Sequence, residues 1–212
     1  GVREQQSDHV GAVIGFKTTK GEIVHAKVAS SFISFEQASL NLKELGSDNF
    51  DTLVQKGKDV WNKELSKIEV EGGTLDQYRT FYSCMYRSLL FPRKFYEIDA
   101  LGKVVHYSPY NGKVLPGYMF TDTGFWDTFR SLFPFLNLMY PTMSKEMQEG
   151  LINAYKESGF FPEWASPGHR GCMVGNNSAS VLVDAYVKGI KVEDVQTLYE
   201  GLINGTKNVH PE

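Results

Sequence analysis

The stretch that decides the fold runs from residue 124 to residue 189. It opens on GFWDTFR at positions 124–130, continues through GFFPEWASPGHRGCMVG at 159–175 and closes on VDAYVKG at 183–189. Aromatic rings, glycines, carboxylates, a histidine and an arginine are crowded into it. Such a mixture suits a concave site that stacks an apolar face and hydrogen-bonds a polar edge, as sugar sites do. The competing interpretation is a helical core with decorated loops, and composition alone does not separate the two.

Helical periodicity surrounds this stretch. Apolar residues at helical spacing predict a helix from about 125 to 140, which Pro134 should kink or divide. The same spacing predicts four further helices, at residues 74–90, 141–158, 178–188 and 192–203. Their end signals are a capping-box pattern and two glycine stops, at Thr74–Gln77, Gly159 and Gly189. Residues 94–122 predict a long loop with short strands near 103–106, and a loop of that length is usually functional.

The longest predicted strands lie near the beginning of the chain. Apolar residues alternate with others over 10–16 and again over 24–32, which predicts a β-hairpin or two neighbouring strands. An isolated hairpin is marginal in water, so these strands imply a partner sheet that no later residues clearly supply. Helices are then predicted over 34–45 and 49–65, and Gly72–Gly73 is a plausible domain boundary. The fold class is therefore α+β by content and mainly α, and paired helices with long loops at alternate junctions suit an α/α toroid.

Composition excludes several classes of protein. The net charge of −3 leaves no electrostatic footprint for nucleic acid. No apolar run approaches the length of about 20 residues that a membrane-spanning helix needs. The first residues are polar and lack the apolar core of a signal peptide. Cys84 and Cys172 make no disulfide framework, and each is expected to be a small buried hydrophobe.

The candidate chemistry lies in carboxylates and their aromatic neighbours. Asp122, Asp127, Glu163 and Asp184 fall near predicted loop–helix junctions, and glycoside hydrolysis needs two carboxyl groups flanking the bond. The pair Asp127 and Glu163 is the obvious candidate. Against it, Asp127 lies in the first turn of a helix, where the dipole favours a negative charge, and Asp184 suits a helix surface or a polar position in the core.

Two dipeptides repeat one pairing of residue types. A tryptophan lies next to a carboxylate at Trp126–Asp127 and again at Glu163–Trp164. A tryptophan can stack on the C–H face of a sugar while the carboxylate accepts from adjacent hydroxyls, although either ring can equally anchor a core. His169 and Arg170 add hydrogen-bond donors in a glycine-flanked turn. No zinc-ligand spacing, phosphate-binding loop or serine-hydrolase motif is present.

With these residues the sequence resembles glycoside hydrolase family 92, the calcium-dependent exo-acting α-mannosidases of glycan-degrading bacteria. The resemblance covers essentially the whole chain in the family's order. Its motifs are WNKEL at 61–65, LFPR at 90–93, WDTFR at 126–130, LMYP at 138–141, SGFFPEW at 158–164, CMVG at 172–175 and DAYVKG at 184–189.

The resemblance implies an architecture. Residues 1–33 would be the last strands of an N-terminal β-sandwich, 34–72 a helical linker, and 73–212 the N-terminal part, the first helices, of an (α/α)6 catalytic toroid. It also implies a calcium ion, whose ligands the sequence does not identify, and a periplasmic, secreted or cell-surface location in a bacterium. The expected partners are a mannose-containing glycan and the remainder of the same polypeptide, with no nucleic acid and no membrane span.

The resemblance also limits what these residues can do. The family's general acid lies in a Glu-Gly-Asn motif and its base in a Gly-Asn-Asp-Asp motif, both downstream of the Asp184 helix, and neither occurs here. No catalytic residue is therefore assigned, and the chain alone is expected to be inactive. The residues carried over, as the wall of the mannose subsite, are Trp126, Asp127 and Arg130. The loop residues Glu163, Trp164, His169 and Arg170 are further candidates for binding substrate, on the strength of their own chemistry.

The implied function is that of a fragment of an inverting exo-α-mannosidase, with α-1,2 linkages as the expected substrate. Two departures from the family pattern leave alternatives open. Gly124–Phe125 stands where many members have Ser-Leu, and His169–Arg170 stands where many have Glu-Thr. The alternatives are a glycosidase of the same scaffold with another linkage or substrate, and a non-catalytic glycan-binding module.

Overall fold

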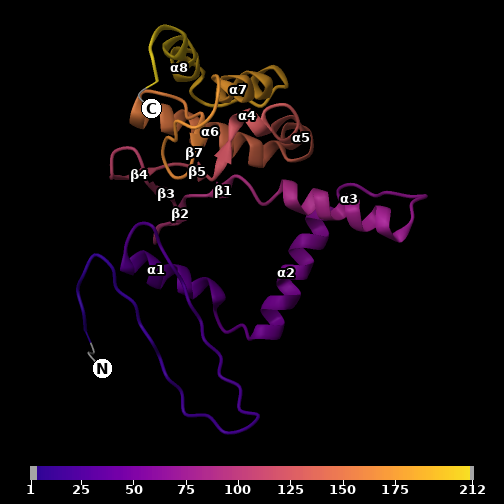
Figure 1. The fold of residues 1–212 in the computed structure, drawn as a ribbon, viewed down its shortest axis with the longest axis vertical. Helices are drawn as coiled ribbons and strands as arrows, with labels where there is room; N and C mark the ends of the chain where they lie inside the picture. The colour runs from indigo at the N-terminus through magenta and orange to yellow at the C-terminus, as the bar shows by residue number, and fades with distance from the viewer. Residues whose placement is uncertain (1–3, 211–212) are drawn as a thin grey trace.

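The computed structural model describes residues 4–210 and combines helices with short strands (Figure 1). The helices are α1 (Phe35–Leu42), the 3-10 helix η1 (Lys43–Leu45), α2 (Phe50–Leu65), α3 (Leu75–Ser88), α4 (Phe125–Thr128), α5 (Leu132–Met139), α6 (Pro141–Ser158), α7 (Asn177–Val187) and α8 (Val195–Lys207). The mixed and mainly helical class predicted from the sequence is confirmed. None of the helices within residues 4–210 is both long and apolar enough to cross a bilayer.

The strands form three small antiparallel sheets in the region predicted as long loops. They are β1 (Arg93–Lys94), β2 (Glu97–Ile98), β3 (Val104–Tyr107), β4 (Val114–Pro116), β5 (Phe120–Thr121), β6 (Thr123–Gly124) and β7 (Trp164–Ala165). β1 pairs with β5, β3 lies between β2 and β4, and β6 pairs with β7. The strand predicted near 103–106 is confirmed as β3. β7 was not predicted, because two residues are too short for alternation to register.

One hydrophobic core joins the helices that follow β6. Helices α5, α6 and α7 pack on one another, and α8 packs on α6 (Figure 1). The centre of the core is made of buried side chains from these elements, chiefly Phe125, Phe133, Leu136, Leu151, Val181 and Leu182. Burial of a side chain of this size stabilises a fold by about 1.5–3 kcal/mol. The core therefore gives a rigid base to the loops that emerge at β6 and β7.

Local signals fixed most helix ends as predicted. The Ser34 and Asn49 side chains cap α1 and α2, and the reciprocal capping box of Thr74 and Gln77 is present at α3. Helix α6 ends at Gly159, which adopts the left-handed conformation with φ of 85°. α8 begins later than predicted, because the Asp194 carboxylate caps it by accepting from the backbone of Thr197 at 3.0 Å.

Pro134 divides the predicted helix at 125–140, but not at its own position. The break falls at residues 129–131, between α4 and α5, and Pro134 lies in the first turn of α5. A proline is tolerated in the first turn because the amide that it lacks has no partner inside the helix there. The chain therefore restarts the helix just upstream of the proline.

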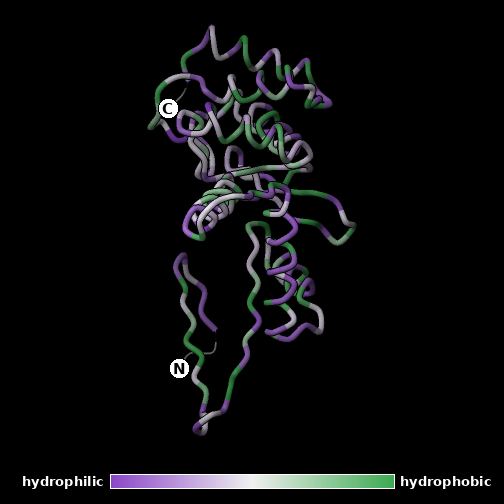
Figure 2. The backbone as a smooth tube through the Cα atoms, turned by 90° about the vertical axis from the view of Figure 1, so that its right-hand side faces the viewer, coloured by the Kyte–Doolittle hydropathy of each residue, from purple (hydrophilic) through white to green (hydrophobic). Residues whose placement is uncertain are grey.

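The predicted strands over 10–16 and 24–32 are absent from the described residues. Residues 10–30 are extended and exposed, apart from a turn near Thr19–Gly21, and form no ladder (Figure 1). Figure 2 shows hydrophobic and hydrophilic residues alternating along this arm, and Val13 is fully exposed. Strand pairing needs a neighbouring edge, and the described chain offers none there. The assignment of 1–33 to a sandwich, 34–72 to a linker and 73–212 to a toroid stays a prediction.

The burial predicted for the two cysteines was wrong. Cys84 and Cys172 are both exposed and unpaired with one another. Cys84 lies on α3, along an open groove that also borders α5, and Cys172 lies in the loop before α7.

Candidate functional site

The pairing of β6 with β7 brings together two segments that lie far apart in the sequence. Gly124 pairs with Trp164, and Thr123 pairs with Ala165. The amide of Asp122 donates to the carbonyl of Ala165 at 2.7 Å, and the amide of Phe125 donates to that of Glu163 at 3.1 Å. The segment 124–130 and the loop 159–175 are therefore joined close to the two pairs of a tryptophan and a carboxylate, Trp126–Asp127 and Glu163–Trp164.

Trp164 and Asp127 meet above Gly124. A methyl group at Gly124 would lie 2.4 and 2.5 Å from Cε3 and Cζ3 of Trp164, and 3.0 Å from Oδ2 of Asp127. An aromatic face and a carboxylate oxygen thus approach one point from two different elements. Trp164 is half-buried and Asp127 is exposed, so both retain surface for a ligand. We name this group, Gly124, Asp127 and Trp164, the corner.

Trp126 takes a different role from the one its neighbour suggests. Its ring is 40% exposed, and the guanidinium carbon of Arg130 lies 4.4 Å from the centre of that ring. The same guanidinium also lies 4.3 Å from the ring of Phe129 and donates to the carbonyl of Trp126 at 2.8 Å. Arg130 is therefore held against its own helix by a cation–π contact. Trp126 and Arg130 form an exposed rim beside the corner.

Glu163 borders a small polar hollow on the other side of the loop. The hollow has a volume of about 110 Å³ and is lined by Phe160, Phe161, Glu163, Asn176, Gly201, Gly205, Asn208 and His210. Partial burial raises the pKa of the Glu163 carboxyl, against an opposing effect of His210. Neither Asp127 nor Trp164 lines this hollow. Nothing in it brings Glu163 to Asp127 as the carboxyl pair that the sequence suggested.

His169 is buried, with only 8% of its surface exposed. Its Nε2 lies 2.8 Å from Oγ of Ser158 in α6, and its ring contacts Tyr110 and His210. Because the Ser158 hydroxyl donates to a backbone carbonyl, Nε2 is assigned as the donor to Ser158. Nδ1 then has no partner among the described residues. Substrate binding by His169 stays a prediction, and its placement favours a role in holding the loop.

Burial lowers the pKa of His169 to about 4, with a further lowering by His210. Since the folded protein favours the neutral ring, this stability is fully present above the unfolded pKa of about 6.5 and is lost as the pH falls towards 4. The shift corresponds to at most about 3 kcal/mol, which solvent screening reduces to about 1–2 kcal/mol. Urea unfolding at pH 7 and pH 4.5 should show that loss for the wild type and a smaller one for His169→Gln. An equal loss in both, with exposed His25→Gln as the control, would contradict this account.

Arg170 follows directly and stays exposed. Its backbone amide donates to the carbonyl of Trp164 at 3.0 Å, which folds the loop back along β7. Within residues 4–210 its guanidinium makes only a long contact, 3.4 Å, with the carbonyl of His169. Of the seven predicted site residues, Arg170 and Trp164 are therefore linked through the backbone, and the Arg170 side chain faces outward.

The other two carboxylates have structural partners. Asp122, at a φ of 61°, pairs with the Arg93 guanidinium and accepts from Ser166 Oγ at 3.0 Å, which ties β1 to the β7 loop. Asp184 accepts from Asn137 at 2.8 Å and from Lys188 at 2.7 Å. Asp184 is half-buried, which suits its interpretation as a polar residue of the helix surface or of the core border.

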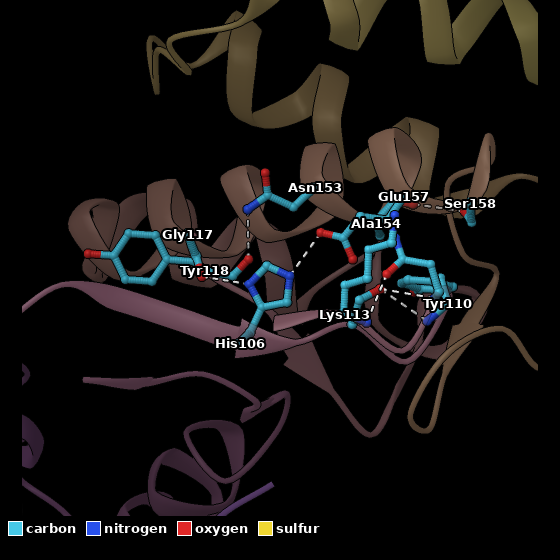
Figure 3. A network of polar contacts seen from close by, with 11 residues as sticks. His106, Tyr110, Lys113, Gly117, Tyr118, Asn153, Ala154, Glu157 and Ser158 are labelled. Carbon is cyan, nitrogen blue, oxygen red and sulfur yellow. Dashed lines mark hydrogen bonds and ion pairs between the residues drawn. The ribbon is translucent and has the colours of Figure 1, made fainter. Parts of the chain in front are cut away.

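Sequence reasoning missed one buried pair, His106 and Glu157. His106 in β3 is fully buried between the carbonyl of Gly117 and the carboxylate of Glu157 in α6, with both distances 2.8 Å (Figure 3). The next residue of α6 is Ser158, which holds His169. The end of α6 thus anchors both the strand region and the β7 loop. A lone histidine in a short strand carries no pattern that could have revealed its partner.

A metal centre has no evident ligand set within residues 4–210. No three His, Cys, Asp or Glu side chains come together there as metal ligands do. The described residues alone therefore do not fit a carboxylate-rich calcium site, and calcium stays a prediction that rests on the resemblance.

Comparison with known proteins relates this geometry to a family. The family model of the glycosyl hydrolase family 92 catalytic domain matches residues 37–212. A solved inverting mannosidase of family GH92 from Bacteroides thetaiotaomicron is 55% identical, with a TM-score of 0.83, over 86% of this chain and 25% of that one. An α-mannosidase of the same family and organism, solved with mannoimidazole, is 28% identical, with a TM-score of 0.78, over 86% of this chain and 24% of its own.

A curated relative points the same way. The "Uncharacterized secreted glycosidase" of Arthroderma benhamiae is 26% identical over 196 residues, which are 89% of this chain and 21% of that protein. The chain therefore spans about a quarter of the length of the solved relatives and less of the curated one. Since the family match covers most of the chain and runs through α4, β7 and the loops between them, this chain belongs to glycosyl hydrolase family 92.

Proposed function

We propose that this chain carries the sugar-holding part of an inverting exo-α-mannosidase that removes terminal mannose from glycans, with α-1,2 linkages as the substrate. The observation that carries the proposal is the corner, where the Trp164 ring and the Asp127 carboxylate approach one point. Membership of the family and 55% identity to a solved inverting mannosidase support the same reaction class.

The corner has the chemistry that a pyranose needs. The Asp127 carboxylate accepts hydrogen bonds from two adjacent hydroxyls of the terminal mannose, and charge-assisted bonds of this kind are stronger than neutral ones. The Trp164 ring offers an apolar face to the sugar's C–H groups. Trp126 and Arg130 line the rim, and the exposed Arg170 lies in the loop that follows Trp164.

Inversion divides the chemistry between two further carboxyl groups. One protonates the departing glycosidic oxygen, and the other activates a water on the opposite face of the ring, about 6.5–9.5 Å away. We assign both to sequence downstream of these residues, because neither family motif occurs in this chain. Asp127 and Trp164 hold the sugar between these groups and leave the proton transfers to them. Calcium and a secreted or periplasmic location belong to this proposal through the resemblance and the secreted relative.

The test measures mannose released from α-1,2-, α-1,3-, α-1,4- and α-1,6-mannobiose by the complete gene product, with NMR of the first-formed anomer. We expect release from α-1,2-mannobiose with β-mannose appearing first, and no turnover by residues 1–212 alone. Preference for another linkage would support the same-scaffold alternative. Binding of mannosides without turnover by the complete product would make this a glycan-binding module and overturn the proposal.

A further inference from the structure

We propose that Gly124 is a positioning residue for sugar binding, because its missing side chain lets Trp164 lie against β6 beside Asp127. The inference rests on the proposed function and adds a residue that touches no substrate itself. It accounts for a glycine at a place where nothing in the backbone requires one. Gly124 has φ of −101° and ψ of 126°, an extended conformation open to any residue.

Gly124 provides space for the Trp164 ring and is not needed for its backbone conformation. A Cβ there would lie 2.4 and 2.5 Å from two ring carbons of Trp164, closer than real side chains come. Gly124 is buried, and its backbone is fixed by the pairing with Trp164 and by the bond between Phe125 and Glu163. The backbone therefore cannot retreat easily, and the ring is the part that must move.

The direction of that movement decides the effect on the site. The same added methyl would lie 3.0 Å from Oδ2 of Asp127, so the carboxylate also leaves little room for a side chain at position 124. In this chain a methyl group at position 124 therefore widens the distance between the Trp164 ring and the Asp127 carboxylate. A sugar whose hydroxyls bind Asp127 would then lose its stacking contact with Trp164. A sugar that stacks on Trp164 would lose its hydrogen bonds to Asp127.

The experiment compares Gly124→Ala with Gly57→Ala, whose added methyl meets nothing within 4 Å on the exposed α2. The complete gene product is labelled with 5-fluorotryptophan, and the fluorine resonance that disappears in Trp164→Phe is assigned to Trp164. We expect that resonance to shift in Gly124→Ala only. We also expect kcat/KM on α-1,2-mannobiose to fall about 100-fold, mostly through KM, since a displacement of about 1 Å can cost that much.

A double variant separates positioning from a general loss of structure. Trp164→Leu makes room for the methyl, so Gly124→Ala added to Trp164→Leu should lower kcat/KM no further than Trp164→Leu alone. A Trp164 resonance unchanged in Gly124→Ala, or a further loss of about 100-fold in the double variant, would overturn the inference. Failure of the proposed function is seen separately, as a wild type that releases no mannose.

Discussion

Replacing Asp127 by Ala in the complete gene product is expected to lower kcat/KM for the terminal mannoside by about 1000-fold, since two hydrogen bonds to a charged acceptor contribute about 3–6 kcal/mol. The Asp127 side chain is exposed, so its removal should leave the hydrophobic core intact. Loss of its favourable place in the first turn of α4 should cost less than about 1 kcal/mol. Initial rates with α-1,2-mannobiose and thermal unfolding measure the two effects.

The matched control for this variant is Asp51→Ala. Asp51 is another exposed carboxylate in the first turn of a helix, α2, and does not belong to the β6–β7 site. It should lose the same small helix-dipole contribution and keep wild-type turnover. Survival of mannose release in Asp127→Ala, or equal losses in both variants, would show that Asp127 does not hold the sugar.

Replacing Glu157 by Ala is expected to destabilise the protein by about 3–5 kcal/mol, because His106 then loses its carboxylate partner in a fully buried place. The Gly117 carbonyl can only accept, so Nδ1 of His106 carries a proton and a further proton lies between Nε2 and Glu157. Glu157→Gln keeps the shape and an acceptor oxygen, and should lose less. Urea unfolding at pH 7 measures both variants.

Glu149→Ala provides the comparison on the same helix. Glu149 pairs with Lys145 at 3.4 Å on the half-exposed side of α6, and a solvent-accessible pair of this kind contributes about 0–1 kcal/mol. Glu157 also lies near the helix C-terminus, where a negative charge is unfavourable, so its removal should regain a few tenths of a kcal/mol. A Glu157→Ala variant no less stable than Glu149→Ala would mean that the buried pair contributes nothing net.

The helices could be predicted because their end signals are local. The site could not be predicted in detail because it is formed by contacts between segments far apart in the sequence. Ser34, Asn49, Thr74 and Gly159 mark helix ends with signals that lie within a few residues, and all four are confirmed. β7 and its partner β6 have two residues each, too few for a period to appear. Their pairing joins segments about forty residues apart, which no local pattern encodes.

The least reliable predictions were those that paired a tryptophan with the carboxylate next to it in the sequence. Trp126 and Asp127 are neighbours in α4, but consecutive helical residues point in different directions. Trp126 contacts Arg130, and the aromatic partner near Asp127 is Trp164 from β7. Glu163 and Trp164 likewise divide between the polar hollow and the corner. The sequence predicted which residue types belong to the site. Which of them contact one another became visible only in the folded structure.

The arrangement of β6 and β7 has a consequence for how such an enzyme changes over generations. The corner rests on a ladder of two residue pairs and on the short helix α4, which packs on α7. Substitutions at exposed positions of the turn after Trp164, such as Pro167, can therefore change the surroundings of the corner with little effect on the interior that keeps the protein folded. New substrate preferences are accessible here through few steps, each with little risk of losing the scaffold.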